Sequence, residues 1–117
     1  MPTPEPLDQE LPDALWGALN DSSRRQMLDR LRAGPLTTSE LAGQFDMSRF
    51  GVMKHLRVLE AAGLVVSEKR GRTRTNHLNP VPLQQIYRRW IAPFERLPAD
   101  RLLRVKQLSE QQQEASQ

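Results

Sequence analysis

The sequence contains no cysteine, which excludes disulfide bonds and thiolate metal sites. It also contains no apolar run near the roughly 20 residues that a membrane-spanning helix needs. Its N-terminal residues carry acids and prolines instead of a basic end followed by an apolar stretch, so they lack the pattern of a signal peptide. We therefore expect a cytoplasmic protein that does not contact a membrane.

Residue types that carry out catalysis are scarce as well. The two histidines, His55 and His77, lie far apart in the sequence, and neither a cysteine nucleophile nor a glycine-rich phosphate loop is present. We predict that the chain is not an enzyme and that it carries no metal or other cofactor.

Positive charge is present but unevenly distributed. The formal net charge is +3, yet residues 1–21 hold five acids and no Lys or Arg, which leaves 17 bases against nine acids in the remainder. Between Arg49 and Arg74 there are seven bases and two acids. Such a local excess attracts a polyanion such as a nucleic acid, and an ordinary solvated basic surface is the alternative interpretation.

The apolar residues recur mainly at helical spacing, and 117 residues are enough for one domain. This spacing predicts helices over residues 11–19, 22–33, 38–45, 49–62 and 83–108. Asp21 or Ser22 can cap the second helix, and Ser48 can cap the fourth. Thr37 and Glu40 fit a capping box before the third.

Two short segments favour strands. Residues 64–67 are rich in β-branched side chains, and residues 73–78 can pair with them across Gly71. In the last helix, Pro93 and Pro98 predict a kink or a break. The expected fold is mainly α with a small β-hairpin, in the order ααααββα. We expect a disordered arm at residues 1–9, the domain at 10–110 and a frayed tail at 111–117.

Residues 37–74 combine two helices, a short turn between them and a basic hairpin, which is the order of a winged helix-turn-helix. The second helix carries bases on its outer face and fits the major groove of B-DNA, which is about 12 Å wide. Short polar side chains at helix starts suit phosphate oxygens, and they are Thr38, Ser39 and Ser48. Bases at the hairpin tip can reach the neighbouring DNA backbone or minor groove, and they are Lys69, Arg70, Arg72 and Arg74.

The stretch from Ser48 to Val65, SRFGVMKHLRVLEAAGLV, resembles the recognition helix of the ArsR family of winged helix-turn-helix repressors. The shared features are a Ser-started helix, a Lys/Arg-His-Leu centre and a Leu-x-x-Ala-Gly-Leu-Val exit into the wing. The TSELA segment that begins at Thr38 and the wing around Gly71 add to the likeness, which covers roughly residues 11–108. The resemblance implies a sequence-specific DNA-binding repressor.

The resemblance also implies a homodimer in which the first and last helices pack across a two-fold axis. Our candidates for that interface are Leu15, Trp16, Leu19, Tyr87, Trp90 and Phe94. The alternative for the aromatic residues is the core of a monomer. We favour the interface because aromatics gathered on terminal helices would otherwise lack a facing surface.

The sequence departs from the family at its metal sites. Where many members carry Cys-x-Cys, this sequence reads SELAG from Ser39 to Gly43. Other members use Asp, His and Glu on the final helix, but between Leu83 and Arg104 the only acids are Glu95 and Asp100 and there is no histidine. The chain resembles the metal-independent branch, and we expect no metal site. An unknown small-molecule inducer is the remaining candidate effector.

Arg49 and Lys54 are the best candidates to contact base edges, because extended cations can reach guanine acceptors, and phosphate contact is the alternative. Gly51 allows close approach to the groove. Met53 either offers DNA an apolar contact or packs beneath the wing.

His55 either contacts a phosphate or forms a structural hydrogen bond, whereas His77 has a structural role. Arg57 either contacts DNA or pairs with Glu60 at helical spacing. The wing bases contact phosphate or the minor groove, with a merely solvated turn as the alternative.

The leading hypothesis is a repressor whose two recognition helices, about 34–36 Å apart, read an inverted repeat. An inducer would act by changing the spacing of those helices. A winged-helix module that binds protein is a second hypothesis, which predicts a neutral or acidic recognition helix and wing. A third is a metal sensor with an unfamiliar site, which requires clustered histidines and carboxylates.

Overall fold

The computed structural model describes residues 11–115. The arm predicted at residues 1–9 lies outside the described residues, as do residues 116 and 117. The described residues form two compact units, which divide between Ile86 and Tyr87.

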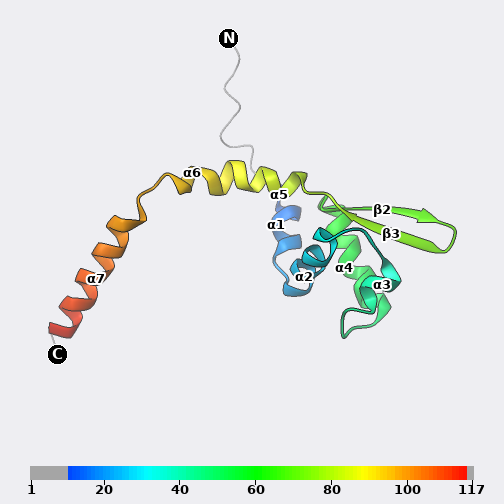
Figure 1. The fold of residues 1–117 in the computed structure, drawn as a ribbon, viewed down its shortest axis with the longest axis horizontal. Coiled ribbons are helices and arrows are strands. Elements are labelled where there is room, and N and C mark those ends of the chain that lie inside the picture. Colours follow the sequence, from blue (N-terminus) through cyan, green and yellow to red (C-terminus); the bar gives the residue numbers. More distant parts are fainter. Residues whose placement is uncertain (1–10, 116–117) are drawn as a thin grey trace, which may run out of the picture. The chain divides into compact units, whose positions relative to one another are not determined.

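The first unit contains the first four helices that the periodicity predicts and the beginning of the fifth (Figure 1). They are α1 (Asp13–Leu19), α2 (Ser22–Arg32), α3 (Thr38–Ala42), α4 (Arg49–Ala61) and α5 (Val81–Ile86). The predicted caps are confirmed: Asp21, Thr37 and Ser48 each accept a hydrogen bond at 3.0 Å from the backbone N–H three residues later. Glu40 Oε1 accepts from the N–H of Thr37 at 3.0 Å, which completes the capping box. These bonds satisfy backbone donors that a helix start leaves open.

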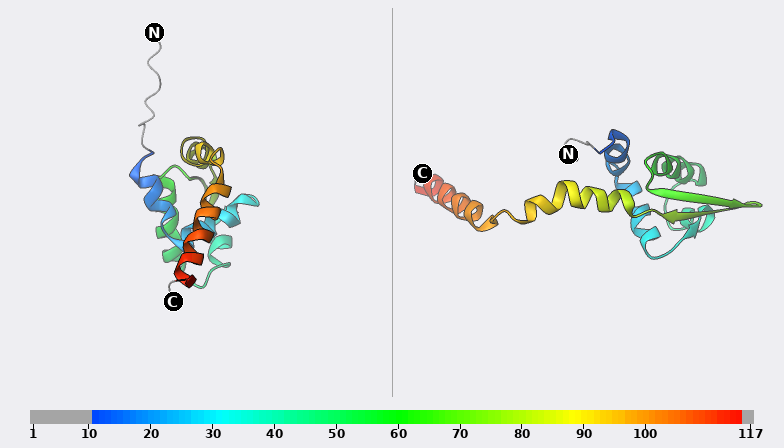
Figure 2. Two further views of the ribbon diagram at one scale, coloured as in Figure 1. Left: turned by 90° about the vertical axis from the view of Figure 1, so that its left-hand side faces the viewer. Right: turned by 90° about the horizontal axis from the view of Figure 1, so that it is seen from above.

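A small antiparallel sheet follows the order β1-β3-β2, with β1 (Leu36–Thr37), β2 (Val65–Arg70) and β3 (Thr73–Leu78). The predicted hairpin is confirmed, with Arg70 opposite Thr73 at its end. Gly71 has a φ of +62° at the turn, a left-handed conformation that glycine adopts without strain. The hairpin extends beyond the helices α3 and α4 (Figures 1 and 2), as expected for a wing.

The strand β1 was not expected, and it adds a third member to the predicted hairpin. It pairs with β3, with Leu36 opposite Asn76 and Thr37 opposite Thr75. Two residues are too few to show the alternation that identifies a strand in a sequence. The fold is therefore mainly helical with a three-stranded sheet, in the order ααβααββα through α5.

One apolar core joins the elements of the first unit. The helix α4 contributes a buried stripe at i, i+4 and i+7, which is Val52, Leu56 and Leu59. The other elements contribute the remaining core side chains, which are Leu15, Ala18, Met27, Leu28, Leu31, Leu41, Leu64, Val65 and Ile86. Gly63 ends α4 with a φ of +76° and directs the chain into β2. This core fixes which face of α4 is turned to solvent.

In the second unit, the last predicted helix is interrupted at two places. A π-helical segment, η1 (Tyr87–Ile91), precedes α6 (Ala92–Glu95), and α7 (Ala99–Ala115) follows. Pro93 has no N–H to donate four residues back, and a π-helical turn accommodates that missing bond. Pro98 disfavours a helical conformation at the residue before it, so the helix is split there. The helix α7 continues through Ala115, into the segment expected to be a frayed tail.

Candidate nucleic-acid interface

The helices α3 and α4, with the short connection at residues 43–48, form the predicted helix-turn-helix. Because Val52, Leu56 and Leu59 face the core, residues half a turn away must face solvent. Phe50, Lys54 and Arg57 occupy that outer face and are all exposed. The expectation that bases lie on the outer face of α4 is therefore confirmed for Lys54 and Arg57.

The N-terminal end of α4 presents polar groups to solvent. Ser48 and Arg49 are both exposed. Ser48 Oγ accepts the capping bond from Gly51, which leaves its hydroxyl proton available to another acceptor such as a phosphate oxygen. Gly51 and Met53 are half-buried, and a Cβ added at Gly51 would lie 3.4 Å from Ser48 Oγ. These positions agree with a surface that approaches DNA closely at the helix start.

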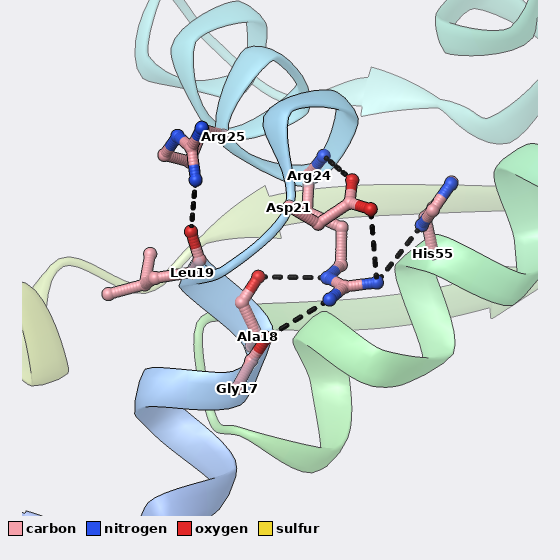
Figure 3. A network of polar contacts seen from close by, with 7 residues as sticks. All are labelled: Gly17, Ala18, Leu19, Asp21, Arg24, Arg25 and His55. Carbon is pink, nitrogen blue, oxygen red and sulfur yellow. Dashed lines mark hydrogen bonds and ion pairs between the residues drawn. The ribbon is translucent and has the colours of Figure 1, made fainter.

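Arg24 of α2 joins α1 to the recognition helix α4 (Figure 3). Its Nε and Nη2 donate to the carbonyls of Ala18 at 2.8 Å and Gly17 at 3.0 Å, which end α1. Its Nη1 lies 3.3 Å from His55 Nδ1 and 4.0 Å from Asp21 Oδ2. This network was not predicted from the sequence, because three of its links join residues of different helices.

The contact with Arg24 defines the chemistry of His55. A guanidinium can only donate, so Nδ1 must accept, which places the proton of the neutral imidazole on Nε2. Figure 3 shows Nε2 turned away from Arg24. The structural hydrogen bond is present, and Nε2 keeps a donor for a phosphate, so the two interpretations of His55 are compatible.

The same arginine also affects Asp21. The backbone N–H of Arg24, together with the charge of its side chain, lowers the pKa of the Asp21 carboxyl, although burial opposes this effect.

The wing carries its cations on both strands and at the turn. Lys69, Arg70 and Arg72 are exposed, and Arg70 makes a loose ion pair of 3.7 Å with Glu68. The same Glu68 lies 3.1 Å from His77 Nε2, in agreement with a structural role for His77. Exposed ion pairs of this kind contribute little to stability. Arg70 can therefore leave Glu68 for another anion at little cost.

Arg74 differs from the other wing cations because it pairs with the helix α4. Its Nη1 lies 3.5 Å from Glu60 Oε1, so the carboxylate considered as a partner for Arg57 is used by Arg74. Within the described residues, Arg57 has no ion pair with Glu60 and stays on the exposed face.

Thr38 has a structural role in this arrangement. It is buried, and its Oγ1 accepts a hydrogen bond at 3.1 Å from Asn76 Nδ2. Asn76 is fully buried, donates also to the carbonyl of Leu36 at 3.2 Å, and its Oδ1 accepts from Ser67 at 2.9 Å. We therefore leave Thr38 out of the proposed DNA-contacting set and retain Ser39, which is exposed.

The role of Asn76 was not predicted from the sequence. The signal was available: asparagine is depleted in strand interiors, so its place in the middle of β3 required polar partners.

The residues expected at a dimer interface fall into two groups. In the first unit Leu15 is buried in the core of its own chain, Leu19 is half-buried and Trp16 is exposed. In the second unit Tyr87, Trp90 and Phe94 are all exposed. We therefore leave Leu15 out of the interface proposed for the dimer.

The three aromatic residues of the second unit are held by contacts within that unit. The rings of Trp90 and Phe94 meet edge to face, with centroids 5.2 Å apart. Tyr87 donates a hydrogen bond at 3.0 Å to Glu95, which raises the pKa of the Tyr87 hydroxyl.

Residues 11–115 lack two features that would change the interpretation of the site. No helix there is both long and apolar enough to cross a membrane. No three side chains of His, Asp or Glu in that part of the chain come together as a metal ion would need.

This arrangement of helices, sheet and hairpin defines a winged helix-turn-helix protein, and comparison with known proteins agrees. A helix-turn-helix domain family matches residues 19–68. The HTH-type transcriptional regulator Rv2034 of Mycobacterium tuberculosis is 43% identical over 72 residues, which are 62% of this chain and 67% of that protein. The transcriptional repressor SdpR of Bacillus subtilis is 31% identical over 70 residues, 60% of this chain and 78% of the repressor.

Among solved structures, the ArsR family transcriptional regulator RHA00566 superposes with a TM-score of 0.65 at 38% identity. The match covers 71% of this chain and 84% of that one. The chain belongs to the ArsR family of winged helix-turn-helix transcriptional regulators. The family confirms the expectation of a regulator in place of an enzyme.

Proposed function

We propose that the chain is a cytoplasmic DNA-binding repressor that acts as a homodimer on an inverted-repeat operator. The observation that carries this proposal is the exposed N-terminal half of α4. Arg49 at the helix start and Lys54 on the outer face are both exposed, and the capping bond leaves the hydroxyl proton of Ser48 available. Cations at the start of a recognition helix can contact guanine acceptors and phosphates in the major groove. The name of the relative SdpR supports repression as the outcome of binding.

The exposed cations of the wing support a second contact with the same DNA. Lys69, Arg70 and Arg72 extend away from the core, where they can reach a neighbouring phosphate or the minor groove. A module that binds another protein would not need positive charge on both the recognition helix and the wing. The charge pattern therefore favours DNA as the partner.

Apolar exposure supports the homodimer. Trp16 is exposed in the first unit, and Tyr87, Trp90 and Phe94 are exposed in the second. A two-fold axis would place two copies of α4 on one face of the duplex, about 34–36 Å apart. An inducer that changed this spacing would weaken operator binding.

The proposal includes no thiolate metal site, because the sequence holds no cysteine. A small organic inducer therefore remains the effector class that we propose. A metal sensor with an unfamiliar site would be recognised by a rise in the melting temperature when Zn²⁺ or Ni²⁺ is added.

The test is a set of DNA-binding isotherms at several salt concentrations, measured by fluorescence anisotropy. The probes are a labelled duplex from upstream of the chain's own coding sequence and a scrambled duplex of the same composition. We expect tight, salt-sensitive binding with a clear preference for the upstream duplex. Equal, weak binding to both duplexes would contradict an operator in that DNA and favour another target.

Charge-removing variants make the test specific to the proposed surface. Lys54→Ala removes an exposed cation of α4, and Lys106→Ala removes an exposed cation of α7. If Lys54 contacts a phosphate, its loss lowers the salt slope by about one, and if it reads a base it relaxes specificity at that position. Lys106→Ala should bind as the unmodified chain does. Equal losses of DNA affinity in the two variants would mean that binding depends on the net charge of the chain and not on the outer face of α4. Sedimentation equilibrium on the same samples tests the dimer.

A further inference from the structure

The residue Phe50 has no role in the fold that would account for its position. Phe50 is 66% exposed, the highest value for a large apolar residue in residues 11–86. It is the second residue of α4, directly after Arg49. A Phe in this position adds nothing to the core, so its surroundings must explain it.

The neighbours of Phe50 on the helix surface are cations. Lys54 lies four residues later and Arg57 seven residues later, so both share its face. The buried stripe of Val52, Leu56 and Leu59 lies on the opposite side of the helix. An aromatic ring framed by Lys and Arg on an exposed face suits a partner that is negatively charged and also offers a small apolar group.

The major groove of DNA is such a partner. Each phosphate carries a negative charge, and the only apolar group on the major-groove edges of the bases is the 5-methyl of thymine. The N-terminal residues of a recognition helix are those that contact base edges. A protein surface complementary to this face would have to be acidic around an apolar centre, a combination that the major groove already offers.

We propose that Phe50 reads the 5-methyl group of a thymine in each half-site of the operator. This inference rests on the proposed function and adds a specificity-determining contact to it. Arg49 and Lys54 then supply the polar contacts on either side of the ring, and Phe50 distinguishes thymine from cytosine at one position. The phenyl ring also excludes water from the neighbouring polar contacts, which strengthens them.

The experiment begins by selecting bound sequences from a random duplex library with the full chain. The selected duplex is then made with each thymine replaced in turn by uracil, which removes only the methyl group. We expect one replacement per half-site to weaken binding by about fourfold, the value of one buried methyl-sized group. The variant Phe50→Ala should bind the thymine and uracil duplexes equally, whereas Phe50→Leu should retain part of the preference.

Two controls separate this role from folding and from general apolar contact. Phe50 is mostly exposed, so Phe50→Ala should melt at the same temperature as the unmodified chain. Val66→Ala shortens another exposed apolar side chain, on β2, and should keep the full preference for thymine. Together these variants assign any loss of the preference to the ring on α4.

The outcomes distinguish the two proposals. If no sequence is enriched by the unmodified chain, the proposed function fails and this inference fails with it. If an operator is enriched but no uracil replacement weakens binding, or if Phe50→Ala keeps the preference, the operator-binding function stands and the inference about Phe50 is overturned.

Discussion

Residues 11–86 bury twelve apolar side chains in one core, whereas residues 87–114 leave nine large apolar side chains exposed. The exposed set is Tyr87, Trp90, Ile91, Phe94, Leu97, Leu102, Leu103, Val105 and Leu108. Both segments are similarly rich in apolar residues, so composition does not separate them. What separates them is that the first unit folds its apolar faces against each other and the second has only one layer of helix.

A single layer of helix gains little stability by itself. Short isolated helices are marginal in water, and most helical stability in proteins comes from packing an apolar face. The first unit therefore contains the means of its own stability, whereas the second unit buries no large apolar side chain in a core of its own. We expect substitutions to act differently in the two units, mainly on folding in the first and mainly on association in the second.

The largest contrast is expected between two matched Leu→Ala substitutions. Leu59 is fully buried in α4, so Leu59→Ala should lower the free energy of unfolding by about 3 kcal/mol. Leu108 is 55% exposed in α7, so Leu108→Ala should change it by less than about 0.5 kcal/mol. Urea unfolding followed by circular dichroism, at the lowest usable protein concentration, gives both values. Equal losses would show that α7 packs into a core after all.

The second contrast concerns association. Buried aromatic residues dominate many interfaces, so Trp90→Ala should weaken the proposed dimer by about 2 kcal/mol, close to 30-fold in its dissociation constant. Val66→Ala, an exposed position in the first unit, should leave the dimer unchanged. Sedimentation equilibrium measures both dissociation constants. A dimer of undiminished affinity in Trp90→Ala would move the interface away from the aromatic residues of the second unit.

The same contrast explains what the sequence could predict. In the first unit, local chemistry and tertiary packing agree: Thr37 with Glu40, and Ser48 with Gly51, form their caps within three residues, so the helix starts were predictable. The strand β1 and the contact of Arg24 with His55 were not, because each joins residues more than 30 positions apart. Thr38 shows the same limit at the candidate site, since Asn76, far along the chain, decides its burial.

In the second unit the periodicity was clear but the breaks were not. Pro93 and Pro98 both predicted an interruption, and only the backbone distinguished a π-helical turn near the first from a split at the second. Periodicity indicates which residues share a face of the helix. It does not indicate how the backbone changes where proline lacks an N–H donor.

Polar contacts also contribute to the first unit, and Arg24 offers a test. Its side chain is 16% exposed and bonds two carbonyls at the end of α1, so Arg24→Met should cost about 1.5 kcal/mol. Arg25 is exposed and bonds only the carbonyl of Leu19, so the matched Arg25→Met should cost about 0.5 kcal/mol. Thermal unfolding compares the two variants. Similar losses would mean that the contacts among α1, α2 and α4 are mainly apolar.

The smallest expected effect distinguishes the units by the direction of their pH dependence. In the first unit, hydrogen bonds from the backbone and hydroxyl of Thr37 hold the pKa of Glu40 below its ordinary value of 4.5. The stabilisation by this carboxylate is therefore complete above pH 4.5 and is lost as the pH falls through the lowered pKa. In the second unit the bond to Glu95 raises the pKa of Tyr87 above 10.0, so its contribution is present below pH 10.0 and is lost as the pH rises through the raised pKa.

Two variants make this last contrast measurable. Glu40→Gln keeps a neutral acceptor for the capping box, so it should flatten the acid side of the stability profile while changing stability little at neutral pH. Tyr87→Phe should leave the acid side unchanged and affect only the alkaline side. Melting temperatures of the three proteins, measured from about pH 3 to pH 11, follow both limbs. An acid limb that is the same in Glu40→Gln as in the unmodified chain would assign the loss to Asp21, whose pKa is also lowered, from its ordinary value of 3.8.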